Sequence, residues 1–512
     1  MKRAANSAIP RAGVAILVIA GLLAMAEGLA SCGPKARPGI PPRHLVLVTV
    51  AAMRADHSST WMHSRPTTAV AADPLARKEG RAMGLDDLAA SGVVFANAFA
   101  PSCRTVPALA SLFTGRAPIE CGVTNDDEIV GADVPTLAEL FANGGYRTAA
   151  FVTRTDLPLE FTVGRGFSTF QTCANDRETL LAAAAWSKLD PGDGTRRMVW
   201  VHLAGLEPPW NRAANSEWVD EQLSQRDFGP DPDPETLRAL VAGERVPGER
   251  DREMLSRRYD RELTRTTHSL AEFLRTVYDY YQPDADTSET WARTVFVLAG
   301  TTGVLLGEDG MVGHGGTLHE HALHVPLVMR HPDSLTGERV FEDVVELADV
   351  LPTLVEWFDL ATPRRVQGRS LLALTDSFEA RTFETRPAIA SLDDRHVSAR
   401  DERFHLVMNP FGKRLRDRPV GAKVVGPSAL FEPARDPLER DDVTDDFPYS
   451  AGALRKQLDQ VLRRETRPYT LNQKRRVTPD GRIESADPAL LPPYDAGLPA
   501  EPPTPAAPKS GG

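Results

Sequence analysis

Two adjacent threonines follow an apolar run that has the composition of a buried strand. The run Val295–Leu298 holds only branched or aromatic apolar residues, and Thr301 and Thr302 follow it at the start of a glycine-rich segment. In α/β proteins, ligands bind at the carboxyl ends of strands, so these hydroxyls lie where chemistry is expected. Hard divalent cations prefer carboxylate oxygens, and this strand end supplies no acid.

A third candidate hydroxyl belongs to Thr105, in the segment Ala100–Pro118 that reads APSCRTVPALASLFTGRAP. This segment resembles the signature of the sulfatase family, in which a nucleophile precedes x-Pro-Ser-Arg and then Ala-Ser-Leu-Leu-Thr-Gly-Arg. The resemblance places Thr105 at the nucleophile position and Leu109 where the family has arginine. Thr105 is neither of the residues that become formylglycine, although threonine is the nucleophile in phosphatase branches of the superfamily. Its alternative role is to cap the following helix.

Further segments resemble motifs of the same family in the family's order, over roughly residues 43–463. They are VTVAAMRADH, DVPTLAELFANGGYRTAAFV, GRGFSTF, VHLAGLEPPW, YDRELTRTTHSL, GEDGMVGHGGTLHEHALHVPLVMR, ELADVLPTLVEWF, VQGRSLL and LFEPARDPLERDDV. The resemblance implies an alkaline-phosphatase-like α/β/α sandwich with a mainly parallel central sheet, followed by a small C-terminal α+β subdomain. It also implies an ancestral activity on sulfate, phosphate or phosphonate esters.

The resemblance also locates the metal ligands that the family uses, and three of them are replaced. Ala51 stands where the first metal-binding acid is expected, and Thr301 and Thr302 stand where the family has an Asp-His pair. A divalent metal lowers the pKa of a bound oxygen acid from ~15.7 to ~7. We therefore expect no cofactor and no activated nucleophile; the alternative is a divalent metal ion held by an atypical set of residues.

Other motif positions keep their expected residues. Arg54 matches the loop after the first strand, His202 matches the histidine of VHL, and His314 matches the histidine that contacts the ester oxyanion in relatives. Glu207 is either a residual metal ligand or a surface carboxylate. Three more histidines follow His314 closely, and we expect packing and surface roles for them in preference to a metal site: His319, His321 and His324.

These observations favour a catalytically degenerate pseudoenzyme, which binds an anionic ligand such as sulfate or phosphate or acts as an interaction protein of the cell envelope. The expected pocket is uncharged or mildly basic, with Arg54 and His314 facing it and a helix N-terminus donating at Thr105. Two alternatives stay open. One is an ester hydrolase that uses Thr105 with an atypical metal set, and the other is a purely structural envelope lipoprotein.

The N-terminal segment is typical of an export signal. Three basic residues lie within residues 1–11, and residues 12–26 are uncharged and mostly apolar, as in a signal peptide. Leu29–Cys32 resembles the bacterial lipobox, in which the cysteine is lipidated; plain cleavage with Cys32 incidental is the alternative. Because Gly33 is not the aspartate linked to inner-membrane retention, we expect an outer-membrane lipoprotein that faces the periplasm or the exterior, with the membrane as a partner.

Charge and cysteine content narrow the function classes further. The formal net charge is −11, which argues against nucleic acid as a partner. Four cysteines are present: Cys32, Cys103, Cys121 and Cys173. A disulfide between Cys103 and Cys121 is disfavoured, because about ten helical residues span about 15 Å and a disulfide needs Cα atoms within about 7 Å.

The order of elements predicts how these residues are positioned. We expect strands at 44–50, 147–152, 197–205 and 293–300, and helices at 136–143, 259–277, 348–360 and 451–464. The expected division is a signal peptide (1–31), a lipidated Pro-rich tether (32–42), a sulfatase-like domain (43–380) with a polar, loop-rich insertion (211–258), a C-terminal subdomain (381–466) and a disordered Pro-rich tail (467–512).

Overall fold

The computed structural model describes twelve stretches of the chain. They are residues 42–69, 84–188, 195–210, 233–281, 293–331, 339–375, 383, 385–393, 396–408, 428–464, 475–478 and 482–485. The expected signal peptide, Cys32 and nearly all of the tether lie outside these residues. Among the described residues, no helix combines the length and the apolar composition that a membrane span needs.

A central sheet of eight strands organises the fold, in the order β10-β2-β9-β6-β1-β5-β3-β4. The strands are β1 (His44–Val50), β2 (Val93–Phe99), β3 (Arg147–Thr153), β4 (Thr169–Cys173), β5 (Arg197–Leu203), β6 (Thr294–Gly300), β9 (Leu327–Arg330) and β10 (Arg339–Glu346). Only β9 pairs antiparallel with its neighbours in this sheet. The expected mainly parallel sheet is therefore confirmed.

The three middle strands β5, β1 and β6 are buried along their whole length. Their near-continuous apolar sequences are those of parallel strands covered on both faces. Val50 of β1 pairs with Leu203 of β5 and with Gly300 of β6. The three strands thus end together, so the residues that follow them meet at one edge of the sheet.

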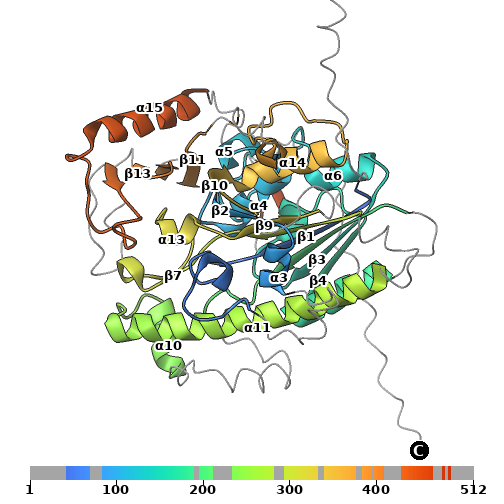
Figure 1. Cartoon of the computed structure of the whole chain (residues 1–512), viewed down its shortest axis with the longest axis horizontal. Helices are drawn as coiled ribbons and strands as arrows, with labels where there is room; N and C mark the ends of the chain where they lie inside the picture. Colours follow the sequence, from blue (N-terminus) through green and yellow to red (C-terminus); the bar gives the residue numbers. More distant parts are fainter. Residues whose placement is uncertain are drawn as a thin grey trace, which may run out of the picture. The chain divides into compact units, whose positions relative to one another are not determined.

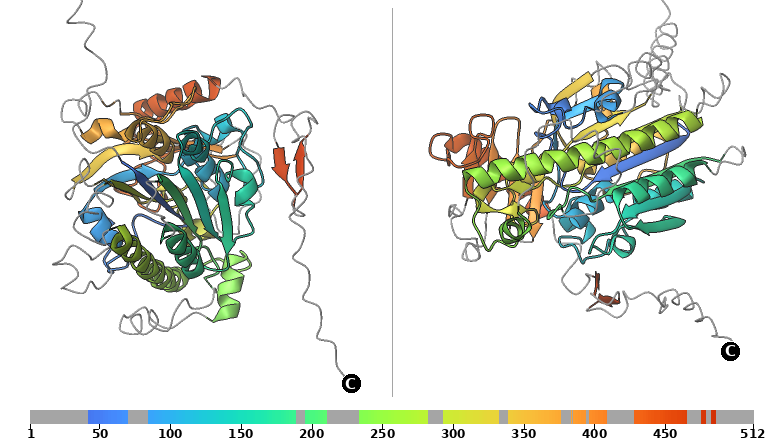
Figure 2. Two further views of the ribbon diagram at one scale, coloured as in Figure 1. Left: turned by 90° about the vertical axis from the view of Figure 1, so that its right-hand side faces the viewer. Right: turned by 90° about the horizontal axis from the view of Figure 1, so that it is seen from below.

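Helices cover both faces of the sheet, as Figure 1 and the edge-on view in Figure 2 show. On one face, α4 (Thr105–Thr114), α6 (Leu137–Asn143) and α14 (Val350–Trp357) bury apolar side chains in a shared core. On the other face, α3 (Leu85–Ala90), α8 (Asp176–Lys188) and α11 (Glu249–Tyr281) form a second core. The expected α/β/α sandwich is confirmed.

Shorter elements connect these layers. They are η1 (Ser59–Trp61), α5 (Pro118–Cys121), α7 (Leu159–Thr162), α10 (Pro234–Val241), β7 (Leu305–Leu306), η2 (Glu308–Gly310), β8 (Val312–Gly313), α13 (Glu320–Leu323), η3 (Leu347–Asp349) and η4 (Leu371–Thr375). Cys103, Cys121 and Cys173 are free and buried. Burial raises the pKa of the Cys103 thiol to about 12, so it stays protonated near neutral pH.

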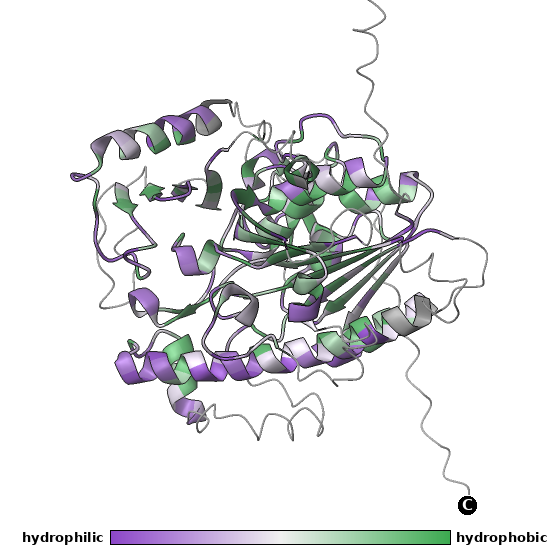
Figure 3. Cartoon of the chain, in the orientation of Figure 1, coloured by the Kyte–Doolittle hydropathy of each residue, from purple (hydrophilic) through white to green (hydrophobic). Residues whose placement is uncertain are grey.

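Helix α11 begins ten residues earlier than expected, at Glu249. Together with α10, it makes most of the described part of the expected loop-rich insertion (residues 233–258) helical. The sequence hid this because the first turns of α11 are almost wholly charged, which weakens the apolar period. Figure 3 shows the polar residues of α11 concentrated at this end. Ion pairs between neighbouring turns, such as Arg257–Glu253 and Arg258–Glu262, support these turns.

The C-terminal part contains a separate antiparallel sheet, in the order β11 (Ala388–Asp393), β12 (His396–Arg400), β13 (His405–Met408) and β14 (Ser428–Phe431). Helix α15 (Pro448–Arg464) packs Leu454 and Leu458 into the core of this sheet. The expected small α+β subdomain is present.

Part of the segment expected to be a disordered tail forms a hairpin. Strands β15 (Arg475–Val477) and β16 (Ile483–Ser485) pair with each other, and the Val477 N–H donates to the Asp127 carbonyl at 2.8 Å. The expectation of disorder was wrong for these residues. A backbone contact of this kind leaves no mark in the composition from which disorder was inferred.

Candidate functional site

The ends of β1 and β6 bring together the three positions that replace metal ligands. The Thr301 N–H donates to the Val50 carbonyl at 2.9 Å, and the Ala52 N–H donates to Thr302 Oγ1 at 3.2 Å. Ala51, Thr301 and Thr302 are all fully buried. The strand edge therefore has the geometry of an α/β ligand site.

The chemical groups at this edge do not fit a divalent cation. Ala51 has no ligand atom, and the Thr302 hydroxyl already accepts a backbone hydrogen bond. The Thr301 hydroxyl has no hydrogen-bond partner among the residues that the structure describes. None of these three side chains is an acid, so they cannot offset the charge of a hard cation.

Thr105 is the first residue of α4, and its hydroxyl is buried without a hydrogen-bond partner in the described part of the chain. The residue at the N-cap position is Arg104, so Thr105 does not cap the helix. Instead, Asp126 Oδ1 accepts the Val106 N–H at 3.0 Å. A carboxylate of the protein itself thus occupies the helix N-terminus, where an anionic ligand was expected.

His314 lies beside acids. Its Nε2 is 3.8 Å from Glu207 Oε1. Burial alone would lower the pKa of His314, but the nearby carboxylate of Glu207, with the charge of Asp126, raises it. Arg104 Nη1 in turn lies 3.5 Å from Asp126 Oδ2, so the charges near His314 are two carboxylates and one guanidinium.

Arg54 is buried, and its guanidinium is taken up by groups of the protein. It pairs with Asp56 and with Glu308, each at 2.7 Å, and it donates to the Val304 carbonyl at 3.1 Å. Burial alone would raise the pKa of Glu308, but Arg54 and His321 lower it to about 2. Two carboxylates neutralise this arginine, which fixes the loop after β1 and leaves little attraction for an external anion.

His202 lies inside the sheet edge. Its Nδ1 is 2.8 Å from Thr49 Oγ1, and the Trp200 indole N–H donates to the same hydroxyl at 2.9 Å. The imidazole is thus held by side chains of β1 and β5.

The three histidines after His314 have different partners, although the His319 and His321 rings lie beside each other with centroids 5.1 Å apart. His319 caps α13 and its Nε2 is 3.0 Å from the Leu438 carbonyl, whereas His324 Nε2 is 2.8 Å from the Ala96 carbonyl. His321 Nε2 is 3.8 Å from Glu308 Oε1. Burial, followed by the charge of Arg54, lowers the pKa of His321 to about 3. These side chains do not converge on one point.

The sequence reasoning missed two clusters of metal-ligand types. One joins His57 and His63 to Asp260, and the other is Glu320 with His405 and Glu439. Burial would raise the pKa of Glu439, but His405 and His319 hold it well below its usual range. The six-residue spacing of His57 and His63 was a signal, but only the fold brings Asp260 to them.

Comparisons with known proteins relate the chain to sulfatases. The family model described as Sulfatase matches residues 43–360. The chain is 24% identical over 217 residues to an arylsulfatase of Clostridium perfringens, a match that covers 41% of each protein. It is 29% identical over 129 residues to a delta 4,5-hexuronate-2-O-sulfatase of Bacteroides thetaiotaomicron, which covers 24% of each. The matches thus span less than half the length of these relatives.

Solved structures resemble the fold over most of its length. The phosphonate monoester hydrolase of Agrobacterium radiobacter has a TM-score of 0.61 and 18% identity, covering 88% of this chain and 100% of that one. A 2-O GAG sulfatase has a TM-score of 0.60 and 16% identity, covering 88% and 96%. At these identities the likeness concerns the fold.

Proposed function

The chain belongs to the sulfatase family, and we propose that it is a member that has lost ester cleavage and acts through interactions in the bacterial cell envelope. The observation that carries this proposal is the strand edge. Ala51, Thr301 and Thr302 are buried together where the resemblance implies metal ligands, and none of them is an acid. In this proposal the strand ends keep the family's arrangement, but their side chains no longer bind a metal.

The consequence for chemistry concerns Thr105. A threonine hydroxyl is not ionised near neutral pH, and metal coordination is the means by which such oxygen acids are activated. None of the contacts described for Thr105 supplies a base to its hydroxyl. Loss of an activating group costs catalysis many orders of magnitude.

An interaction role agrees better with the site than an anion carrier does. Asp126, which is paired with Arg104, already accepts at the N-terminus of α4, and Glu207 lies beside His314, so groups that could hold a sulfate or phosphate have carboxylate partners in the protein. Arg54, which we expected to attract an anion, is neutralised by two acids. We propose that a lipid on Cys32 places this domain at the outer membrane, where its surface contacts other envelope components.

The alternative is an ester hydrolase with an atypical metal set, and the pairing of His314 with Glu207 favours it. Steady-state assays on residues 33–512 with aryl sulfate, phosphate and phosphonate esters separate the two functions, with magnesium, calcium, manganese and zinc supplied in turn. We expect the wild type and Thr105→Ala to give the same background rate. A wild-type rate at least tenfold above that of the variant establishes the hydrolase.

A further inference from the structure

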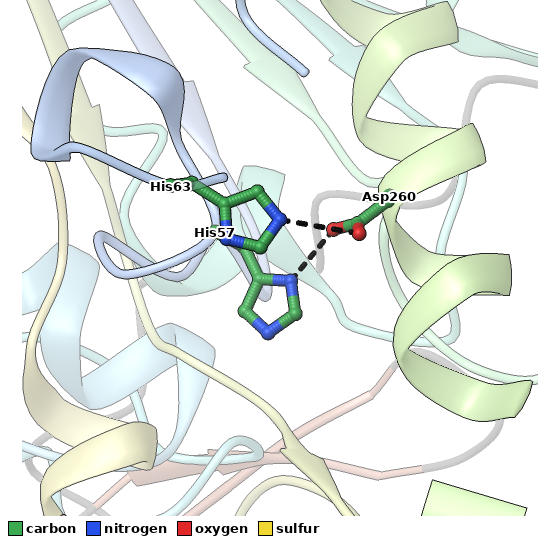
Figure 4. Close-up of side chains that lie close together, drawn as sticks. All are labelled: His57, His63 and Asp260. Carbon is green, nitrogen blue, oxygen red and sulfur yellow. Dashed lines mark hydrogen bonds and ion pairs between the residues drawn. The ribbon is translucent and has the colours of Figure 1, made fainter. Parts of the chain in front are cut away.

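The loop after β1 contributes two imidazoles to a cluster that does not include Ala51, Thr301 or Thr302 at the strand ends. His57 Nδ1 is 2.6 Å from Asp260 Oδ1, and His63 Nε2 is 3.2 Å from Asp260 Oδ2. One ligand atom from each of the three residues lies within 4.8 Å of the other two. Figure 4 shows both rings directed at the carboxylate, which projects from α11.

These separations are close to those around a tetrahedral zinc ion. With bonds of about 2.0–2.1 Å, two ligand atoms of such an ion lie about 3.3 Å apart. The distance from His63 Nε2 to Asp260 Oδ2 already has about this value, and that from His57 Nδ1 to Asp260 Oδ1 needs to open by under 1 Å. The ligand atoms of the two imidazoles lie within 4.8 Å of each other, and their rings, stacked with centroids 4.8 Å apart, have to turn for both to bind one ion. We propose that His57, His63 and Asp260 form a binding site for a zinc-like divalent transition-metal ion.

The His57–His63–Asp260 cluster is partly open to solvent, and the ring of one of its histidines is packed against a neighbouring aromatic side chain. The side chain of Asp260 is fully buried on α11, whereas those of His57 and His63 are 8% and 13% exposed, so an ion can enter from the loop side. The edge of His57 rests against the Tyr259 ring, with centroids 5.1 Å apart. A bound ion would tie the loop after β1 to α11, which is a structural role separate from ester chemistry.

Arg65 is the group that an ion has to displace. Its guanidinium contacts Asp260 Oδ2, and its side chain is 32% exposed. It therefore has room to turn into solvent. The charges of Arg65 and Asp260 offset each other, and an ion at the site supplies positive charge in place of the guanidinium. Removal of Arg65 should consequently strengthen metal binding.

The second cluster is a weaker candidate. Glu320 is held by Arg400 through two nitrogens, at 2.6 and 3.4 Å. The side chain of Glu320 is 13% exposed, but those of His405 and Glu439 are only 1% and 2% exposed, so two of the cluster's three ligands are closed off. We interpret this cluster as an ion-pair network between α13 and the C-terminal sheet.

The test measures metal binding by the full chain without a polyhistidine tag, after treatment with chelator. Zinc affinity is determined by competition with an indicator dye, and cobalt is added for its absorption spectrum. We expect one tight zinc site and a four-coordinate cobalt spectrum in the wild type. His63→Gln should weaken zinc binding at least tenfold, and the matched control His396→Gln should leave it unchanged. Arg65→Ala should tighten it at least threefold.

Three results overturn the proposal. They are no zinc or cobalt binding by the wild type, equal binding by His63→Gln, and equal or weaker binding by Arg65→Ala. If His63→Gln does not fold, the zinc affinity of Arg65→Ala still decides between the metal site and an ion pair. A purely structural ion pair predicts a loss of stability in Arg65→Ala without any gain in metal affinity.

Discussion

Placing an acid back at the edge of β6 tests whether this edge has lost its capacity for a cation. Thr301 is fully buried, and its hydroxyl has no hydrogen-bond partner among the described residues. In Thr301→Asp the new carboxylate therefore enters a buried place where no described side chain donates a hydrogen bond to residue 301. Thr301→Asn is the matched control, because its side chain has the same shape and no charge.

The size of the effect follows from burial. Full burial raises a carboxyl pKa by up to about 3–5 units, and each unit corresponds to about 1.4 kcal/mol. At pH 7, Thr301→Asp should thus be less stable than Thr301→Asn by about 4 kcal/mol, because only the ~3 units between the unfolded-state pKa and pH 7 contribute at that pH. This is a large fraction of a typical stability of about 5–15 kcal/mol. Because the folded-state pKa is raised, the deficit should be absent below about pH 4 and grow as pH rises through the folded-state pKa.

Urea unfolding between pH 4 and pH 8 measures this difference for both variants. Adding Ala51→Asp and Thr302→His to Thr301→Asp should produce a protein that calcium stabilises, since a ligand that binds the folded state at 100 times its Kd adds about 2.7 kcal/mol. Equal stability of the Asp and Asn variants at pH 7 without added metal would refute the reasoning. It would show that a cation or another positive group already compensates a charge at this edge.

Three further predictions concern stability and anchoring. Glu439→Gln should destabilise the protein by about 1–3 kcal/mol at pH 7, because His405 loses its buried carboxylate partner. Urea melts should also show a smaller loss of stability than in the wild type as pH falls from about 4.3, where the unfolded-state carboxylate is protonated, through the lowered pKa of the native Glu439. Tyr259→Phe should cost about 1–3 kcal/mol, since two buried backbone groups of Ala52–Arg54 lose their hydroxyl partner; unchanged unfolding would contradict this. A fatty-acid label should mark the wild type in a bacterial host and spare Cys32→Ala, whereas equal labelling would mean that Cys32 is not the anchor.

The strands and helices around the sheet could be predicted because they depend on residues that are close in the sequence. The strand His44–Val50 is fully buried and consists mostly of branched apolar residues, and Thr136 with Glu139 forms the capping box that starts α6. Gly145, with φ of 80°, ends that helix. Such signals depend on neighbouring residues, so they can be read without knowing the fold.

The surroundings of the site were not predictable in this way. Arg54 had been expected to face an anion, but the fold brings Glu308 to it from 254 positions away. Asp126 reaches the N-terminus of α4 from a loop that carries no recognisable motif. The motifs predicted which residues follow each strand. The charges next to those residues come from segments that are distant in the sequence, so the motifs could not predict them.

Trapping of an ester on Thr105 is the most direct test of the central claim. The full chain is incubated with aryl sulfate, phosphate and phosphonate esters and divalent ions, quenched in acid and digested, and the peptide that contains Thr105 is examined by mass spectrometry. The account predicts an unmodified peptide and no release of the aryl alcohol beyond that of Thr105→Ala. A sulfate, phosphate or phosphonate ester on Thr105, with a matching release of aryl alcohol, would contradict it.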